Sequence, residues 1–165
     1  MANIADDITE LVGNTPLLRL HKFEKEAGFE GKILAKLEVF NPTGSVKDRI
    51  AKNMIEQAER DGRLKSGGTI IEATSGNTGI GLAAIAAAKG YQAIIVMPDS
   101  MSKERIRILE AYGAKVVLTP GEKNMGGANE KAAEILEQTE NAIITGQGGN
   151  PSNPEAHYQT TGPEI

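Results

Sequence analysis

A strand, a glycine-rich turn and the start of a helix are expected in Thr69-Ile70-Ile71-Glu72-Ala73-Thr74-Ser75-Gly76-Asn77-Thr78-Gly79-Ile80-Gly81. Residues 69–74 carry the β-branched and apolar side chains that are typical of a buried strand. Residues 78–89 are rich in alanine, and Gly90 follows them as a helix stop. A buried strand that leads directly into a helix is typical of parallel sheets, in which helices connect successive strands. The stretch therefore predicts an α/β fold.

The same alternation of strand and helix continues on both sides of this stretch. Three more strands are expected over residues 93–97, 115–118 and 141–145. Three more helices are expected over residues 46–61, 102–112 and 128–139, the first two capped by Ser45 and Ser102. Because strand–helix–strand connections place successive strands parallel to one another, we expect a small open parallel sheet flanked by helices.

The first 40 residues have a different pattern. A turn and a short strand are expected over residues 14–20, and a second strand over residues 33–38. Glycines at both ends of residues 28–31 indicate a turn between them. We expect the two strands to pair as an antiparallel β-arm.

The residues after the last strand predict a loop and then a helical turn. The loop is expected over residues 146–154, which are rich in Gly, Asn and Pro, and the turn over residues 154–161. The chain is therefore expected to divide into the arm at residues 1–40, the α/β domain at residues 41–145 and a terminal segment at residues 146–165.

The composition is that of an ordinary globular protein and excludes several classes of function. The 165 residues are 39% hydrophobic and 24% charged, with a net charge of −4 and no clustering of Lys or Arg, so nucleic-acid binding is not expected. The absence of cysteine removes disulfides and thiolate metal sites, and His21 and His157 lack the spacing of metal ligands. The longest apolar runs fall short of the roughly 20 residues that span a bilayer, and no signal peptide is apparent at the start. A cytoplasmic protein without a membrane partner is expected.

The turn at residues 74–81 has the features of an anion site. Its small residues let the backbone approach a ligand, and the N–H groups at a helix start attract negative charge. Ligands of open parallel sheets lie at the carboxyl ends of the strands, which is where this turn is placed. Its glycine spacing, G-x-x-G-x-G, differs from the dinucleotide and P-loop patterns. The hydroxyl groups suit a carboxylate; the alternative is a turn that only packs a helix onto the sheet.

Lys47 is expected in the first turn of a helix, where the positive end of the helix dipole disfavours a cation. Desolvation would lower the pKa of its amine further. An amine must lose its proton before it can attack an aldehyde. The alternative is a solvated surface lysine beside Asp48 and Arg49, and for a lysine considered alone this alternative is the stronger one.

Two loops together resemble one family. Residues 42–49, Pro-Thr-Gly-Ser-Val-Lys-Asp-Arg, and residues 74–79, Thr-Ser-Gly-Asn-Thr-Gly, are similar to the lysine loop and the substrate-carboxylate loop of cysteine synthases (O-acetylserine sulfhydrylases). These enzymes belong to the β-family, or fold type II, of pyridoxal-phosphate (PLP) enzymes. The same resemblance extends through residues 12–17, 97–105, 112–114 and 150–154, so that it covers essentially the whole chain. The pattern Met-Pro-x-x-Met-Ser at residues 97–102 favours cysteine or cystathionine synthases over threonine dehydratases.

The resemblance implies a role for each loop. Lys47 would hold PLP as a Schiff base and later remove the substrate α-proton, and Asn77 would hydrogen-bond the phenolic oxygen of the cofactor ring. The residues implied at the substrate carboxylate are Thr74, Ser75, Asn77, Thr78 and Gln147. The implied reaction is a β-replacement that forms L-cysteine from O-acetylserine and sulfide. The implied partners are a second copy of the full-length chain, as a homodimer, and the C-terminal tail of serine acetyltransferase.

The match departs from the family in two respects. Residues 146–151, Gly-Gln-Gly-Gly-Asn-Pro, stand where the family has Gln-Gln-Phe-x-Asn-Pro, so Gly148 replaces an aromatic residue and the loop is expected to be more mobile. The chain also has about half the family's length and lacks the Gly-Thr-Gly-Gly-Thr loop that cradles the cofactor phosphate. We therefore expect that residues 1–40 and 146–165 belong to a truncated large domain and that the 165 residues alone are not catalytically competent. Two alternatives remain: a non-catalytic domain that binds a carboxylate or a partner without PLP, and a cystathionine β-synthase-like enzyme.

Overall fold

A four-stranded parallel sheet forms the centre of the computed structural model, which describes residues 4–165. The strands follow the order β5-β4-β3-β6, and all three neighbouring pairs are parallel. They are β3 (Thr69–Ala73), β4 (Gln92–Pro98), β5 (Lys115–Thr119) and β6 (Ala142–Ile144). The predicted α/β class and the open parallel sheet are confirmed.

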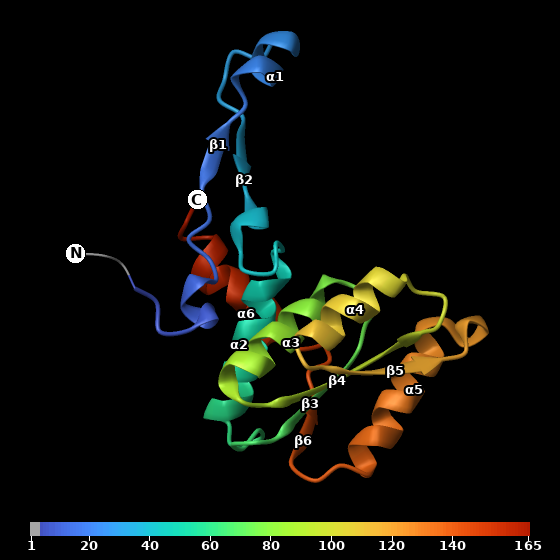
Figure 1. The fold of residues 1–165 in the computed structure, drawn as a ribbon. Coiled ribbons are helices and arrows are strands. Elements are labelled where there is room, and N and C mark those ends of the chain that lie inside the picture. The colour runs from blue at the N-terminus through green and yellow to red at the C-terminus, as the bar shows by residue number, and fades with distance from the viewer. Residues whose placement is uncertain (1–3) are drawn as a thin grey trace.

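Helices cover both faces of this sheet (Figure 1). The long helices are α2 (Lys47–Arg60), α3 (Asn77–Lys89), α4 (Lys103–Ala111) and α5 (Asn124–Glu137). Because successive strand residues point to opposite faces, Ile70 and Ile95 pack with α2, α3 and α4, whereas Ile71 and Val96 pack against Ala128 of α5. Within residues 4–165, no helix is both long and apolar enough to cross a bilayer.

Two helices begin earlier than the sequence pattern predicts. Helix α5 begins at Asn124 rather than at residue 128, although glycines at 126 and 127 lower the intrinsic helix propensity. Gly127 is buried, and a Cβ there would lie 2.5 Å from the Cβ of Lys123. Close packing against the preceding turn therefore requires glycine at this position, and it outweighs the low helix propensity of glycine.

The terminal helix also begins earlier than predicted. Helix α6 (Ser152–Ala156) starts two residues before Pro154 and continues as a π-helix over His157–Thr161. Proline is tolerated in a first helical turn because the N–H that it lacks would have no partner inside the helix. Pro154 is therefore inside α6 rather than at its start.

The predicted antiparallel arm is present and projects away from the sheet (Figure 1). Strands β1 (Leu17–Arg19) and β2 (Leu34–Lys36) pair over three residues each. Between them lies α1 (His21–Glu26), which the sequence pattern did not indicate. The side chain of Glu24 stabilises this tip, because it accepts hydrogen bonds from the Arg19 side chain and from the Ile33 N–H. The boundaries of the three expected segments stay a prediction.

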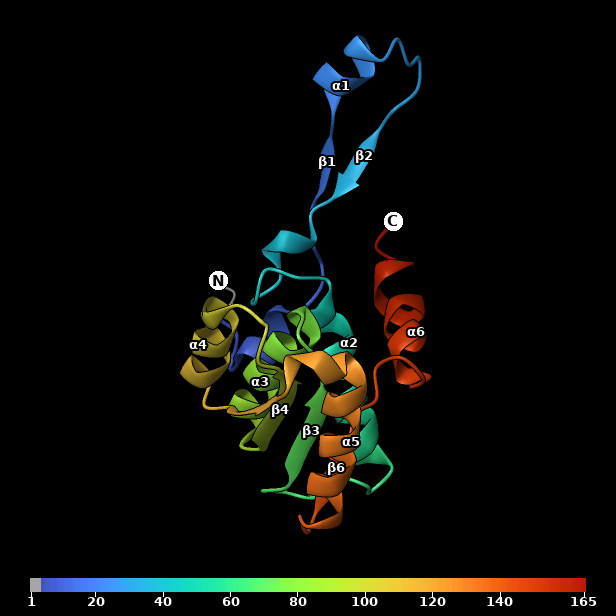
Figure 2. The same cartoon turned by 90° about the vertical axis from the view of Figure 1, so that its right-hand side faces the viewer.

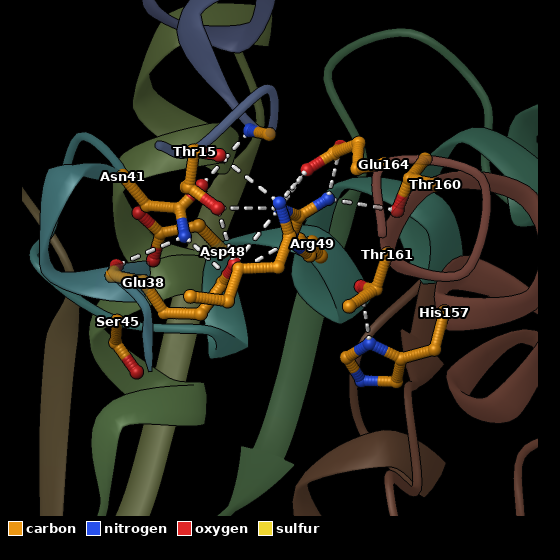
Figure 3. Close-up of polar contacts among 12 residues, drawn as sticks. Thr15, Glu38, Asn41, Ser45, Asp48, Arg49, His157, Thr160, Thr161 and Glu164 are labelled. Atoms are coloured by element: carbon orange, nitrogen blue, oxygen red, sulfur yellow. Dashed lines mark hydrogen bonds and ion pairs between the residues drawn. The ribbon is translucent and has the colours of Figure 1, made fainter. Parts of the chain in front are cut away.

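The last residues of the chain return to the base of the arm, where they meet Arg49 of α2 (Figure 3). The Arg49 guanidinium lies 2.7 Å from Glu164 and 2.8 Å from Glu38, and Glu164 also pairs with Lys36 of β2 at 2.7 Å. Thr15 donates its hydroxyl to Glu38 at 2.6 Å. The arm, α2 and the C-terminal segment are thus joined by one group of charged side chains, the Arg49 cluster (Thr15, Lys36, Glu38, Arg49 and Glu164).

Candidate functional site

The turn between β3 and α3 has the conformation of an open helix start. Thr74 is buried at the end of the strand, and its hydroxyl accepts a hydrogen bond from the Gly76 N–H at 3.2 Å. Gly76 is extended, at φ −114° and ψ −166°, and α3 begins at the next residue. Thr78 is buried, Ser75 is half-buried and Asn77 is exposed. Hydroxyl and amide groups are thus held within one turn of the start of α3.

Two glycines of α3 allow the helix start to lie against its neighbours. A Cβ on Gly79 would lie 2.9 Å from the methyl carbon of Thr74. A Cβ on Gly81 would lie 3.2 Å from the Cβ of Ala51 and 3.3 Å from the carbonyl oxygen of Lys47. Four residues of a helix rise only about 6 Å, so Asn77 lies about one turn from this contact. The structure therefore brings the first turns of α2 and α3 together, and with them Lys47 and the turn at residues 74–78.

Lys47 is the first residue of α2 and is half-buried. Its N–H donates to the Ser45 hydroxyl at 3.1 Å. The helix begins one residue later than expected, so the N-cap is Val46 rather than the predicted Ser45. Gly44, at φ 77°, makes the turn that precedes the cap. The backbone around Lys47 is therefore well determined by local hydrogen bonds.

The two residues that follow Lys47 are buried, not solvated. Asp48 accepts from the N–H of Thr43 at 2.7 Å and from its hydroxyl. Burial, and to a smaller extent the charge of Glu38, raises the pKa of Asp48 above its usual value, while the hydrogen bonds from Thr43 oppose this rise. Arg49 is also buried, with a side chain that is only 1% exposed. The alternative of a solvated surface lysine beside two exposed charged residues therefore does not describe this helix start.

The loop after β6 places Gln147 beside the same turn. Its side-chain oxygen accepts from the Thr78 hydroxyl at 2.5 Å, and its side-chain NH2 donates to the Thr74 hydroxyl at 3.4 Å. Asn153 of α6 donates to the Gln147 carbonyl at 2.9 Å. Residues 69 positions apart in the sequence are thus brought into one polar group.

These side chains form a neutral set of donors at the positive end of a helix. The N–H groups of Asn77 and Thr78 belong to the first turn of α3, where no carbonyl of the helix can accept them. The side-chain amide of Gln147 lies beside them, in contact with the hydroxyls of Thr74 and Thr78. Such a set fits a small carboxylate, since hydrogen bonds and the helix dipole both favour a negative charge there.

Arg105 of α4 is a contributor that the sequence analysis did not single out. Its guanidinium donates to the backbone carbonyl of Ser75, and so connects α4 to the turn. Arg105 is the last residue of the stretch at 97–105 that carries part of the family resemblance. Only that resemblance points to this residue from the sequence. Its cationic side chain adds positive charge at the edge of the turn.

The two histidines lie away from the set of donors. His21 is exposed on α1. His157 is half-buried, and its Nδ1 lies 2.8 Å from the Thr161 hydroxyl (Figure 3). Burial, followed by the charges of Arg49 and Lys47, lowers the pKa of His157 below its ordinary value. Neither geometry gives a histidine a place among the donors at the turn.

The Arg49 cluster holds its carboxylates in the charged form. The hydrogen bond from Arg49 is the main cause that lowers the pKa of Glu38 to about 2, and burial opposes it. The same guanidinium lowers the pKa of Glu164, with help from Lys36 and the Asn14 N–H. The two carboxylates in turn raise the pKa of Arg49. Glu38, Arg49 and Glu164 are therefore held in their charged forms near neutral pH, and Arg49 belongs to the helix turn that begins with Lys47.

Comparison with known proteins identifies similar chains. A family model described as "Pyridoxal-phosphate dependent enzyme" matches residues 8–165. A probable cysteine synthase from Bacillus subtilis (strain 168) is 56% identical over 165 residues, which are 100% of this chain and 52% of that protein.

Solved structures agree with this match. A hydrogen sulfide-producing enzyme from Fusobacterium nucleatum superposes with a TM-score of 0.93 at 46% identity, over 100% of this chain and 53% of that one. A cysteine synthase from Entamoeba histolytica superposes with a TM-score of 0.93 at 45% identity, over 99% of this chain and 49% of that one. The chain thus spans about half the length of the relatives that it matches.

Proposed function

The chain belongs to the family of pyridoxal-phosphate dependent enzymes, and from this premise we propose that it supplies the cofactor lysine and the substrate-carboxylate turn of a cysteine synthase. The observation that carries the proposal is the contact at Gly81, which sets the helix start of Lys47 against the helix start that follows Thr74 and Ser75. A helix start that carries an amine, packed against a helix start with donors for a carboxylate, suits an amino-acid substrate.

The residues at the two helix starts fit the cofactor and the substrate. Lys47 would hold PLP covalently through Nζ, and the side-chain amide of Asn77 would bond the phenolic oxygen of the ring. The residues proposed for the substrate carboxylate are Thr74, Ser75, Asn77, Thr78 and Gln147. The fit rests on the donor set, which offers neutral N–H and O–H groups to an anion and a single amine to an aldehyde.

The proposed reaction is a β-replacement that converts O-acetylserine and sulfide into L-cysteine and acetate. Pyridoxal phosphate, when bound, supplies the electron sink for the substrate Cα. Once the substrate's amino group has replaced Lys47 at the cofactor, the freed Lys47 amine would take the proton from Cα, acetate would depart from Cβ, sulfide would add at Cβ, and the proton would return to Cα from the same amine. The turn at residues 74–78 keeps the carboxylate fixed, so that Cα stays within reach of Lys47 Nζ.

This chain matches only about half of the length of its relatives. We further propose that the activity also requires a part that corresponds to their other half, including an anchor for the cofactor phosphate. Homodimer formation by the full-length protein and binding of the C-terminal tail of serine acetyltransferase are proposals of the same kind. Each depends on the family resemblance of the motifs at Lys47 and at residues 74–79.

The test is an absorbance spectrum of the purified 165-residue chain with PLP, followed by borohydride reduction and mass analysis of peptides. We expect a band near the edge of the visible range and a pyridoxyl group on the peptide that contains Lys47, both lost in Lys47→Ala. Lys103→Ala is the matched control, because Lys103 is also the first residue of a helix but is exposed. A band of equal strength in Lys47→Ala would refute the assignment of Lys47.

A second candidate function is a carboxylate-binding domain that does not use PLP. It is favoured by the donors of the turn at residues 74–78 and of Gln147, which offer hydrogen bonds to an anion without any contribution from PLP. Titration with O-acetylserine in the absence of PLP separates the two candidates. Binding without PLP, together with no absorbance band when PLP is added, supports the second candidate. A band that shifts with O-acetylserine, and not with threonine, supports the first.

A further inference from the structure

Glu72 is a buried carboxylate directly beneath the carboxylate turn. It belongs to β3, lies two residues before Thr74 and is only 3% exposed. Within residues 4–165, no Lys, Arg or His forms an ion pair with it. Burial of an ionised group is costly unless hydrogen bonds replace the lost water, so the donors around Glu72 decide what it does.

Among the described residues, the three donors to Glu72 directly follow β6, the strand beside β3 (Figure 2). Its Oε2 accepts from the Thr145 hydroxyl at 2.5 Å and from the Gly146 N–H at 2.7 Å. Its Oε1 accepts from the Gln147 N–H at 3.2 Å. Both oxygens are therefore occupied by neutral groups of three successive residues.

These contacts begin where the strand pairing ends. The register of β3 with β6 stops at Ile71 and Ile144, and the Thr145 N–H makes the last backbone bond, to the Ile71 carbonyl at 3.2 Å. Beyond this point the backbone turns at Gly146, at φ 59°. A Cβ added to Gly148 or Gly149 would meet no atom within 4 Å, so packing does little to hold this loop. Hydrogen bonds to the Glu72 carboxylate thus connect this loop to β3 after the backbone hydrogen bonds between the strands end.

We propose that Glu72 is a positioning residue that holds Gln147 over the carboxylate turn. The inference rests on the proposed function of that turn. Glu72 holds the Gln147 N–H, while Asn153 holds its carbonyl, and the Gln147 side chain then reaches the hydroxyls of Thr78 and Thr74. Glu72 does not itself face the ligand, since both of its oxygens are occupied and the group is buried. The carboxylate compensates for the flexibility that three glycines give to residues 146–149.

Glu72→Gln removes the charge of the carboxylate and keeps the size and shape of the side chain. In Glu72→Gln the remaining oxygen is best placed toward Thr145 and Gly146, which provide two donors. The new NH2 then faces the Gln147 N–H, where two donors meet and the hydrogen bond is lost. The structure therefore predicts that the effect of this substitution is concentrated at Gln147.

The test is amide hydrogen exchange in the 165-residue chain, combined with titration by acetate and detection of the Gln147 side-chain amide by NMR. In Glu72→Gln we expect exchange at the Gln147 N–H to accelerate about tenfold or more, as loss of a hydrogen bond to a charged group implies, and acetate to bind several-fold more weakly. Exchange at the β3–β4 ladder should not change. Glu24→Gln is the control, because Glu24 is a similarly buried carboxylate on the distant arm.

A double substitution excludes a merely structural role. If Glu72 acts through Gln147, Glu72→Gln should weaken acetate binding no further in a Gln147→Ala background, whereas independent effects would add. Should Glu72→Gln fail to fold, Thr145→Val removes one donor to the carboxylate and should still accelerate exchange at Gln147. Unchanged exchange at Gln147 in every folded variant would overturn the proposal. Failure of the proposed function appears separately, as the absence of a PLP band in the unsubstituted chain.

Discussion

Gly81 is the residue at which the helix that begins with Lys47 meets the helix that follows the turn at residues 74–78. A Cβ there would lie 3.2–3.3 Å from three atoms of α2, namely the Ala51 Cβ, an Asp48 carboxylate oxygen and the Lys47 carbonyl oxygen. These atoms belong to the buried start of a helix and cannot move independently. The spacing of the two helices, and with it the relative position of Lys47 and the turn, depends on this missing side chain.

Gly81→Ala should therefore destabilise the protein by about 1–3 kcal/mol, the usual cost of overpacking, although alanine is the better helix former. The matched control is Gly126→Ala in α5, where an added Cβ meets open space. That change should stabilise the protein by about 0.4–1 kcal/mol. Urea unfolding of both variants measures the difference. Equal and favourable shifts in both would show that α2 and α3 are not in close contact at Gly81.

At the scale of elements, the Arg49 cluster joins the arm, α2 and the C-terminal segment. Its members come from the residues before β1, from β2 and the residues just after it, from α2 and from the last residues of the chain. The arm itself exposes Leu17, Leu18 and Leu34 and so gains little stability from apolar burial. Its attachment to the rest of the molecule depends strongly on these polar contacts.

Arg49→Met should cost about 3–5 kcal/mol, because it leaves Glu38 and Glu164 close together without the cation that neutralises them. Arg63→Met is the control, since Arg63 pairs with Asp61 at an exposed site and its loss should cost less than about 1 kcal/mol. Urea unfolding compares the two, and hydrogen exchange at β1 and β2 locates the change. A similar loss of unfolding free energy in both variants would contradict a stabilising role for burial of the Arg49 ion pairs.

At the scale of the whole molecule, the same cluster predicts how stability depends on pH. Folding lowers the pKa of Glu38 from 4.5 to about 2, and that of Glu164 shifts in the same direction. The unfolded chain then binds more protons than the folded one, so stability falls as the pH is lowered from about 4.5 toward about 2. The raised pKa of Asp48 acts in the opposite direction and offsets part of this loss.

Urea unfolding across this pH range measures the dependence. The slope should become shallower in Arg49→Met, because the carboxylates then lose the partner that lowers their pKa values. An identical slope in that variant and in the unsubstituted chain would place the acid sensitivity elsewhere.

Much of the fold follows from local features of the sequence. Apolar runs such as residues 93–97 predicted the strands, and Gly90 ends α3 in a left-handed conformation, at φ 76°, as its position indicated. The start of α5 was predicted four residues too late, because helix propensity says nothing about the packing that buries Gly127. Helix α1 was missed because its six residues are too few for a clear periodic pattern.

Local sequence features were enough to predict the order of the strands and of the long helices along the chain, the lysine at a helix start and the small residues of the turn at 74–78, since propensity and capping act over a few neighbouring residues. Only the tertiary structure decided which distant groups meet: Gln147 with Thr78, Glu72 with the end of β6, and Arg49 with Glu164. These contacts join residues 69 to 115 positions apart, and their geometry is set by strand order and helix packing. Neither the strand order in the sheet nor the helix packing can be predicted from local sequence patterns.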